Sequence, residues 1–126
     1  IIPVIPIDTV LHVINKKTIV LMDVEGFEYE ALLGSNALIS KSDTTDWIIE
    51  IFPFWVPKGG YALENEKYFE TFELMFSNGY SAWWIDEVFE LLDSEKFKAL
   101  KSKHYSNRYS GNFYFSRSNF NVINFS

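Results

Sequence analysis

The sequence predicts an α/β fold, in which a mostly parallel sheet is flanked by helices on both faces. Two largely apolar runs of strand length, residues 18–22 and 46–52, indicate strands that are buried on both sides. Segments with helical periodicity separate these runs from each other and from two later strand candidates. The resulting order, β-α-β-α-β-α-β, is typical of a sheet built by crossover connections. We expect the last strand to run antiparallel, at or near an edge of the sheet.

The first strand and the first long helix meet at a short acidic turn. The apolar run of residues 18–22 ends at Asp23, and Gly26 opens a helical stretch. Gly34 is expected to end or kink this helix before residues 35–40 continue it. Acids near its start favour the positive end of the helix dipole. Three apolar residues can share one face of the helix: Phe27, Ala31 and Leu38. Three acids lie in or near its first turn: Glu25, Glu28 and Glu30.

The second strand, residues 46–52, is expected to stop at Pro53, since proline cannot donate to a strand ladder. An amphipathic helix is predicted at residues 65–77, closed by Asn78 and Gly79. This spacing predicts a helix that faces the core rather than a ligand. Its apolar face carries five large side chains, with charged residues largely between them: Tyr68, Phe69, Phe72, Met75 and Phe76.

The last part of the chain alternates again between strand and helix. Residues 80–85 and 112–116 are predicted strands, because both are rich in aromatic residues and bounded by turn residues. Residues 94–103 are a predicted helix, capped by Asp93 or by the serine that follows it. The intervening segment 88–92 fits neither pattern clearly.

The composition excludes several classes of protein. With 126 residues, of which 48% are apolar and 18% aromatic, the chain has the length and core material of one domain. It has no Cys, which excludes disulfides, thiolate zinc sites and a cysteine nucleophile, and its 2 His leave little scope for a His-rich metal site. The longest apolar stretches are too short to cross a bilayer, so no membrane partner is expected.

The net charge of −6 is unevenly distributed along the chain. Residues 1–90 hold 15 of the 17 acids, which argues against a nucleic-acid surface. The only basic cluster lies in and just after the predicted helix 94–103: Lys96, Lys98, Lys101, Lys103 and Arg108. We expect it to be a solvated helix face, and a phosphate-bearing partner is the less favoured alternative.

Two acids lie where ligands of open α/β sheets bind, beyond the carboxyl ends of the strands. Asp23 ends the first strand and Glu50 lies near the end of the second. If these strands are neighbours, about 4.8 Å apart, the two carboxylates converge on one cleft. They can then hold a divalent cation, take a proton as general base, or bind a cationic or hydroxylated ligand. The structural alternatives are a helix cap for Asp23 and an ion pair for Glu50.

Aromatic and histidine residues are weaker candidates for a site. Trp55, Trp83 and Trp84 can stack on a substrate, although alternation along a strand places at least one of the last two in the core. His12 and His104 are isolated in the sequence, which favours surface or packing roles for both.

An ordered set of motifs resembles the signature of FkbM-type methyltransferases. Residues 18–34 carry a hydrophobic strand, the core Asp-Val-Glu-Gly-x-Glu and a Leu-x-Gly helix end, and residues 7–11 resemble the short helix that precedes them in that family. Further matches in order are Ile-Ile-Glu-Ile at 48–51, Gly-Tyr at 79–80 and Asn-Phe-Tyr-Phe at 112–115. The resemblance therefore spans nearly the whole chain.

This resemblance implies a Rossmann-like class I fold and S-adenosylmethionine-dependent methylation of hydroxyl oxygens, on sugars, glycans or natural products. By position, it implies that Asp23, Val24, Glu25 and Gly26 bind the cofactor beside the acceptor, and that Asp23 and Glu50 are catalytic. In such folds a Gly-rich turn after an earlier strand anchors the cofactor, and no Gly-x-Gly turn precedes residue 7. We therefore expect residues 1–126 to be a single partial domain, namely the C-terminal portion of a methyltransferase domain. This portion is expected to be inactive on its own, and the protein is expected to be cytoplasmic.

Other functions stay open at this stage. One is a non-catalytic α/β interaction module, or a degenerate methyltransferase fragment, that pairs through an open sheet edge. Another is a metal-assisted hydrolase that uses Asp23, Glu25 and Glu50, although no His cluster supports it and the metal is unknown. For methyl transfer, Asp23 is the first choice as base or metal ligand, before Glu50 and Glu25. The segment 52–63 is the candidate for binding the acceptor.

Overall fold

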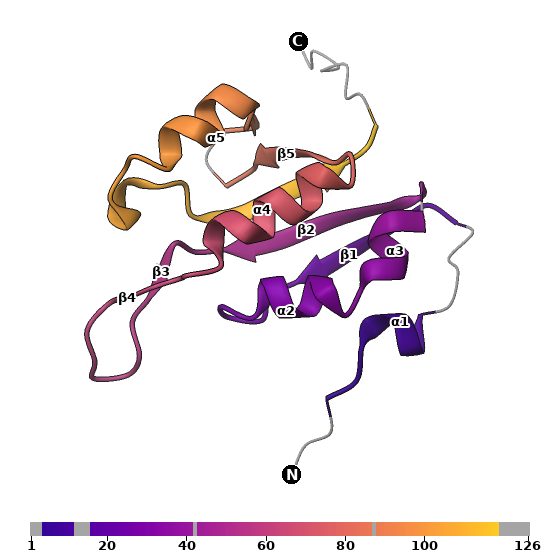
Figure 1. The fold of residues 1–126 in the computed structure, drawn as a ribbon, viewed down its shortest axis with the longest axis horizontal. Coiled ribbons are helices and arrows are strands. Elements are labelled where there is room, and N and C mark those ends of the chain that lie inside the picture. The colour runs from indigo at the N-terminus through magenta and orange to yellow at the C-terminus, as the bar shows by residue number, and fades with distance from the viewer. Residues whose placement is uncertain (1–3, 12–15, 42, 87, 119–126) are drawn as a thin grey trace.

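The computed structural model of the protein describes residues 4–11, 16–41, 43–86 and 88–118. In Figure 1, α2, α3 and α4 lie in front of a twisted sheet, and the β3–β4 hairpin projects at the lower left. None of the described helices has the length and apolar character needed to span a membrane. The elements in chain order are α1 (Ile7–Val10), β1 (Thr18–Met22), α2 (Glu28–Leu33), α3 (Asn36–Lys41), β2 (Thr45–Ile51), β3 (Phe54–Trp55), β4 (Leu63–Glu64), α4 (Tyr68–Ser77), β5 (Ser81–Trp84), β6 (Glu90–Leu91), α5 (Ser94–Leu100), the 3₁₀ turn η1 (Tyr105–Asn107) and β7 (Gly111–Ser116).

The main sheet has five strands in the order β1-β2-β7-β5-β6. β1 and β2 are parallel, whereas the pairs β2–β7, β7–β5 and β5–β6 are antiparallel. The predicted α/β class is confirmed, but the expectation of a mostly parallel sheet is wrong. β1, β2 and β5 nevertheless point the same way, since β2 and β5 both run against β7 between them. Their carboxyl ends therefore lie along one end of the sheet.

The sequence predicts that β7 lies at or near an edge of the sheet. This prediction is wrong, because β7 lies in the middle, between β2 and β5. Its direction is antiparallel as predicted, and all its residues from 113 to 116 are buried. A strand that is buried on both faces is most stable between two partners, because both rows of its backbone N–H and C=O groups are then paired. The antiparallel edge strand is instead β6, which lies within the ambiguous segment 88–92.

The helices that bury side chains all pack on one face of the sheet, which contradicts the predicted helices on both faces. Leu32 of α2, Ile39 of α3, Phe72 of α4 and Phe97 of α5 belong to one core cluster. The strand order explains this, because the chain moves from β1 to β2 to β5 in one direction across the sheet. Right-handed crossovers then place each connecting helix on the same side. Helices reach the second face only where the order of parallel strands reverses, and the described strands show no such reversal.

The aromatic stripe of α4 forms the centre of the core. Phe72 is fully buried, and its ring centroid lies 4.9 Å from that of Phe113 and 5.8 Å from that of Phe115 on β7. Tyr68 and Met75 are fully buried beside it. The predicted use of this stripe as core is confirmed, although α4 begins three residues later than predicted.

β1 is an edge strand, although its apolar run predicted burial on both faces. Met22 is buried on the helix side, but Ile19 and Leu21 on the opposite side are 55% and 76% exposed. Within the described part of the chain, no strand pairs with the outer edge of β1. We call the sheet face that carries Ile19 and Leu21, and on which no described helix packs, the bare face.

Local signals set most other boundaries. Gly34 separates α2 from α3, as predicted. The Asp93 side chain caps α5 by accepting hydrogen bonds from the N–H groups of Glu95 at 3.0 Å and Lys96 at 2.9 Å. The helix ends at Leu100, before the predicted limit of residue 103, because the chain turns there toward η1.

Candidate functional site

Two acids lie at the ends of the parallel strands β1 and β2. Asp23 directly follows β1, and Glu50 follows Ile49, the register partner of Met22. The Asp23 carboxyl group lies close enough to that of Glu50 to raise its pKa. The structure thus brings both predicted site residues together, and their chemical roles stay a prediction.

The electrostatic environment sets Glu50 apart. Partial burial raises the pKa of its carboxyl group, and the negative charges of Asp23, Asp86 and Glu25 raise this pKa further. A carboxylate with a raised pKa accepts a proton more strongly than an ordinary one. Glu50 is therefore well suited to receive a proton from a hydroxyl group beside it.

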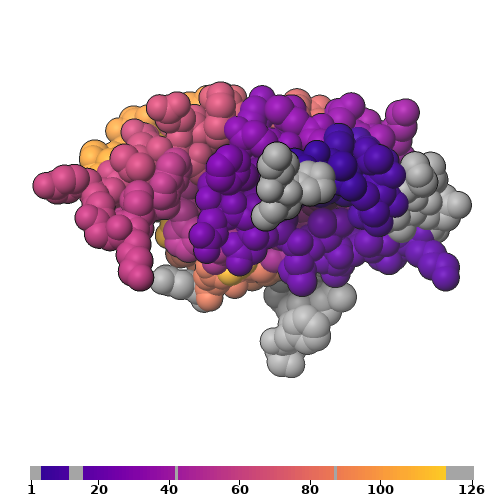
Figure 2. Space-filling view, turned by 90° about the horizontal axis from the view of Figure 1, so that it is seen from below, coloured from indigo at the N-terminus to yellow at the C-terminus, as the bar shows by residue number. Residues whose placement is uncertain are grey.

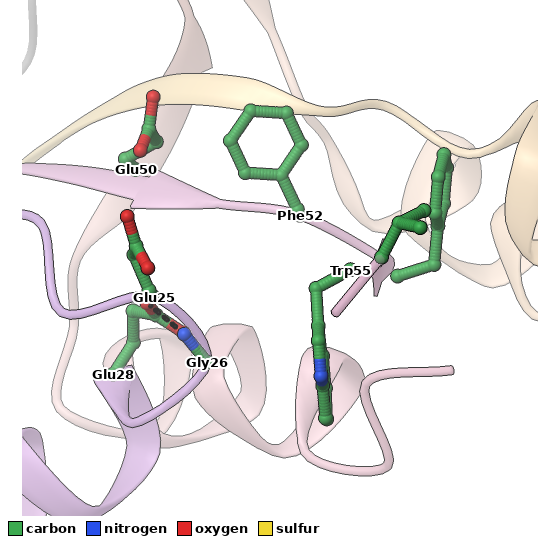
Figure 3. Close-up of a pocket in the computed structure, with 8 residues that line it drawn as sticks. Glu25, Gly26, Glu28, Glu50, Phe52 and Trp55 are labelled. Carbon is green, nitrogen blue, oxygen red and sulfur yellow. Dashed lines mark hydrogen bonds between the residues drawn. The ribbon is translucent and has the colours of Figure 1, made fainter. Parts of the chain in front are cut away.

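The turn after Asp23 has an unusual backbone. Glu25 and Gly26 both have positive φ angles, 47° and 96°, and the N–H of Phe27 donates to the C=O of Val24 across the turn at 3.3 Å. A positive φ is costly for any residue other than glycine, and such strain is concentrated at functional sites. The turn places Glu25 near enough to Glu50 for its charge to raise the pKa of Glu50 (Figure 3).

Glu28 stabilises this turn from inside. Only 2% of its surface is exposed, and its Oε1 accepts a hydrogen bond from the N–H of Gly26 at 2.8 Å (Figure 3). Burial raises the pKa of Glu28, and the hydrogen bonds from the N–H groups of Gly26 and Glu28 itself oppose that rise. The sequence predicts Glu28 only as a helix-dipole acid, whereas its carboxyl group also fixes the geometry of the turn.

Asp86 is a further acid at this end of the sheet that the sequence analysis missed. It lies beyond β5, and its Oδ2 and Oδ1 accept hydrogen bonds from the backbone N–H and the Nδ2 of Asn112, at 2.8 and 2.9 Å. Asn112 is in turn the register partner of Glu50. The rule that selected Asp23 and Glu50 also applies to Asp86, because it follows a predicted strand that ends at the same side of the sheet.

Asp86 can approach β7 only because residue 111 is glycine. Gly111 has a φ of 107°, and a Cβ built on it would overlap the Asp86 carboxylate. The clamp between Asp86 and Asn112 therefore depends on a position where any side chain is excluded.

A hollow of about 330 Å³ opens between the acidic strand ends and the β3–β4 hairpin. Its volume is in the range of small-molecule sites. The predicted acceptor segment 52–63 supplies half of the lining, which is apolar, and the other half comes from the turn and from β2. The lining residues are Glu25, Gly26, Glu28 and Glu50 on one side and Phe52, Phe54, Trp55 and Val56 on the other.

A second hollow of about 680 Å³ adjoins the first. The two share Glu25, Gly26 and Trp55, which form the boundary between them. Its other lining is more polar and comes from α2, β4 and the start of α4: Phe27, Glu30, Leu63, Glu64, Asn65, Glu66 and Lys67.

Other residues that the sequence singled out lie away from both hollows. Trp83 and Trp84 point to opposite faces of β5, and Trp83 is only 6% exposed, so at least one is a packing residue as expected. His104 caps η1 through its Nδ1. His12 falls outside the described residues.

The basic cluster is largely paired with acids. Lys96 and Lys101 lie at the surface as predicted, whereas the Arg108 side chain is only 10% exposed and packs on the Phe69 ring. Three of its cations form ion pairs: Lys96 with Glu90, Lys101 with Glu73, and Arg108 with Glu64. Across the described ranges, no group of three or more His, Cys, Asp or Glu side chains is arranged to hold a metal ion. The described geometry therefore gives no support to the metal-assisted hydrolase.

Fold and site together define an α/β protein with an acidic hollow at the carboxyl ends of its strands. Comparison with known protein families then identifies the family to which the chain belongs. The sequence pattern of the methyltransferase FkbM domain matches residues 1–82, which include the 23–26 turn and Glu50. The chain belongs to this methyltransferase family, and the resemblance of residues 18–34 is confirmed. No curated protein and no solved structure matches the chain.

Proposed function

We propose that the protein transfers a methyl group from S-adenosylmethionine to a hydroxyl oxygen of a sugar, glycan or natural-product acceptor. Membership of the FkbM family gives the methyltransferase class. The observation that carries the rest is the placement of Asp23 and Glu50 at the adjoining ends of β1 and β2, where Glu50 lines the smaller hollow. Such a pair supplies the proton acceptor that an alcohol substrate needs.

The residues at the strand ends fit the chemistry of this cofactor. Its methionine end carries a cationic sulfonium and a cationic ammonium group beside a carboxylate, and the negative charge of Asp23, Glu25, Glu50 and Asp86 attracts the two cations. Gly26 has no side chain, which lets the Trp55 ring pack against this turn at the wall of the hollow. When bound, S-adenosylmethionine supplies an electrophilic methyl group on a positively charged sulfur.

The chain's own residues then have three tasks. Asp23 or Glu50 accepts the proton that the acceptor hydroxyl loses as its oxygen attacks. Phe52 and Phe54 exclude water from the hollow, and the turn of residues 23–28 fixes the position of the acids. The attraction between these acids and the cationic cofactor serves binding more than rate, because it weakens as positive charge is lost in the transition state.

The strand arrangement supports the Rossmann-like part of the proposal. β1, β2 and β5 run in the same direction, helices connect them on one side, and β7 runs against them. The exposed Ile19 and Leu21 fit a sheet that continues beyond β1. We accordingly propose that residues 1–126 form part of a larger methyltransferase domain and, alone, bind S-adenosylmethionine weakly.

The test of the site is the variant Asp23→Asn in the full-length protein, assayed for methyl transfer to a hydroxylated acceptor. We expect turnover to fall about 100-fold or more, because the first proton acceptor is lost. The thermal unfolding midpoint should change little, since Asp23 is exposed. Asp43→Asn, at an acid whose side chain is 94% exposed, is the matched control. Near-normal turnover of Asp23→Asn would overturn the assignment.

The bare face favours a second candidate, a non-catalytic interaction module. Ile19 and Leu21 expose a large apolar area next to an unpaired strand edge, and such surfaces pair with other chains. Methyl transfer by the full-length protein, abolished by Asp23→Asn, favours the enzyme. Stable association with a partner chain, with no methyl transfer to any acceptor tested, favours the module.

A further inference from the structure

Trp55 stands at the boundary of the two hollows and is held there by its neighbours. A Cβ built on Gly26 would lie 3.6 Å from the Trp55 ring, so the turn packs directly against one part of the indole. The side chain still leaves 41% of its surface exposed to the hollows and to solvent. Trp55 is therefore a fixed aromatic surface in an open cleft.

The hairpin that carries Trp55 is anchored at its base. Asn65, which is only 5% exposed, donates from its backbone N–H to the C=O of Pro53 at 2.9 Å and from its Nδ2 to the C=O of Phe52 at 3.0 Å. The Phe54 ring packs against Tyr105 of η1, with centroids 5.4 Å apart. In Figure 2 the pink atoms of this hairpin stand out at the left, next to the purple atoms of the β1–α2 region. A pre-ordered surface of this kind loses little entropy when a ligand binds.

We propose that the two hollows form one continuous acceptor cleft for a neutral glycan of two or more sugar rings. The ring with the reactive hydroxyl lies between Glu50 and Trp55, and the next ring lies in the hollow beyond Trp55. The proposal rests on the proposed methyl transfer for the identity of the reactive end, whereas the binding mode follows from the cleft itself.

The chemistry of the lining matches that of a sugar. A sugar ring offers hydroxyl donors around its rim and an apolar C–H surface on its face. Carboxylates accept hydrogen bonds from the hydroxyls, and an indole ring covers the apolar face. The smaller hollow presents both, with Glu25 and Glu50 opposite Phe52 and Trp55.

The charge of the cleft disfavours anionic acceptors. Acids line both hollows, with Glu30 and Glu66 added in the larger one. Among the described residues, Lys67 is the only cation in either lining, and its ammonium group already lies 3.4 Å from Glu70. A phosphorylated or carboxylated glycan would therefore be repelled, and a neutral one would not.

The size of the second hollow is the reason to expect more than one ring. It is about twice as large as the first and shares its boundary at Trp55. A single ring bound beside Glu50 would leave this hollow without a ligand and would contact only one part of Trp55. A chain of two or more rings contacts acids and aromatic surface on both sides.

The experiment is binding of the full-length protein to an array of neutral, anionic and cationic glycans, followed by affinity measurements in solution with the best neutral ligand. We expect neutral oligosaccharides to bind best, and the terminal monosaccharide of that ligand to bind at least about tenfold more weakly, since it forgoes the contacts of the second hollow. Trp55→Ala should weaken oligosaccharide binding at least about tenfold, and Trp55→Phe should retain most of it. Tyr61→Ala, at a hairpin residue that is 92% exposed and lines neither hollow, should bind normally.

A second variant tests the larger hollow independently of Trp55. Leu63 is 48% exposed in β4, so Leu63→Trp should fold normally and fill part of that hollow. It should lower the affinity for the oligosaccharide to that for the monosaccharide and leave the monosaccharide unaffected. The proposal is overturned by equal affinities for the two ligands, by unchanged binding in Trp55→Ala, or by binding of charged glycans alone or of none.

Failure of this proposal and failure of the proposed function give different results. Array binding needs no methyl donor, so glycan binding that depends on Trp55, without methyl transfer, rejects the methyltransferase activity and keeps the cleft. Methyl transfer to a compact acceptor that is unaffected by Trp55→Ala rejects the cleft and keeps the activity.

Discussion

Ionisation of the Glu50 carboxyl group costs more free energy in the folded protein than in the unfolded chain, because partial burial and the Asp23 carboxyl group raise its pKa. In the unfolded chain this pKa returns to its ordinary value of 4.5. Protonation of Glu50 therefore stabilises the fold fully below pH 4.5, and this stabilisation is lost as the pH rises through the raised pKa. We expect Glu50→Gln to have a higher free energy of unfolding than the wild type at pH 7, measured by urea denaturation.

The difference between Glu50→Gln and the wild type should shrink as the pH falls towards 4.5, because both then carry a neutral side chain. Glu95→Gln, at an exposed acid of α5, gives the background response to such a change. A difference that stays constant over this pH range would show that the raised pKa of Glu50 has no bearing on stability.

Gly111 gives a second prediction at the level of single residues. Alanine there would have to adopt a φ of 107° and overlap the Asp86 carboxylate. We expect Gly111→Ala to lower the free energy of unfolding by about 3 kcal/mol or more, as measured by chemical denaturation.

Gly59→Ala is the matched control for this change. Gly59 also has a positive φ, of 76°, but a Cβ built there meets nothing within 4 Å. Gly59→Ala should lower the free energy of unfolding by about 1 kcal/mol, because alanine there meets only the unfavourable backbone conformation. Similar losses in the two variants would mean that Asp86 moves aside freely and does not clamp β7.

Some site residues could be predicted from the sequence and others could not. Asp23 and Glu50 follow apolar runs directly, so their place at the strand ends depends only on local pattern. Asp86 follows the same rule, but its importance lies in its bonds to Asn112, a contact across the sheet that no local pattern shows. The positive φ of Glu25 was equally hidden, since the neighbouring glycine is the residue that a sequence suggests for that conformation.

At the level of elements, α3 depends on a distant cap. Asp8 of α1 accepts hydrogen bonds from the backbone N–H groups of Ala37 and Leu38, at 2.7 and 3.2 Å, at the start of α3. A helix of six residues has little stability of its own, so this contact also ties α1 to the fold. We expect Asp8→Ala to cost about 1 kcal/mol of stability and to increase amide hydrogen exchange in α3.

The cap of α5 provides a comparison for Asp8. Asp93 makes equivalent hydrogen bonds, but within its own helix. Asp93→Ala should cost a similar amount and should raise hydrogen exchange in α5 without changing it in α3. Asp8→Asn should retain most of the cap. If Asp8→Ala leaves exchange in α3 unchanged, the contact contributes nothing to the docking of α1.

Strands and helices were easier to predict than their pairing. The apolar runs at 18–22 and 46–52 and the stripe on α4 lie where the sequence indicates, because periodicity is a local property. The insertion of β7 between β2 and β5 depends on contacts between segments about 65 residues apart, such as the hydrogen bond from Tyr114 to Asp46. The sequence places Asp46 at the start of a strand but does not show that its buried carboxylate, which also pairs with Lys17, joins two strands.

At the level of the whole molecule, the sheet is covered on one side only by described helices. One-directional crossovers explain why the core lies on the helix side and why Ile19 and Leu21 are exposed on the other. The sequence pattern of β1 is that of a strand buried on both faces. In the structure, the described residues cover only the face of β1 that packs against the helices. This mismatch supports the proposal that residues 1–126 are part of a larger domain.

The bare face therefore predicts self-association of the isolated 126-residue chain. Among the described residues, no strand pairs with the outer edge of β1, and Ile19 and Leu21 offer apolar surface beside it. Leu21→Lys should reduce association in sedimentation velocity experiments without loss of secondary structure, because a charge on an edge strand opposes pairing and position 21 is 76% exposed. Leu33→Lys, at an apolar residue of α2 that is 51% exposed on the helix side, should associate like the wild type. A monomeric wild-type chain at all concentrations, or equal effects of the two substitutions, would show that the bare face does not drive association.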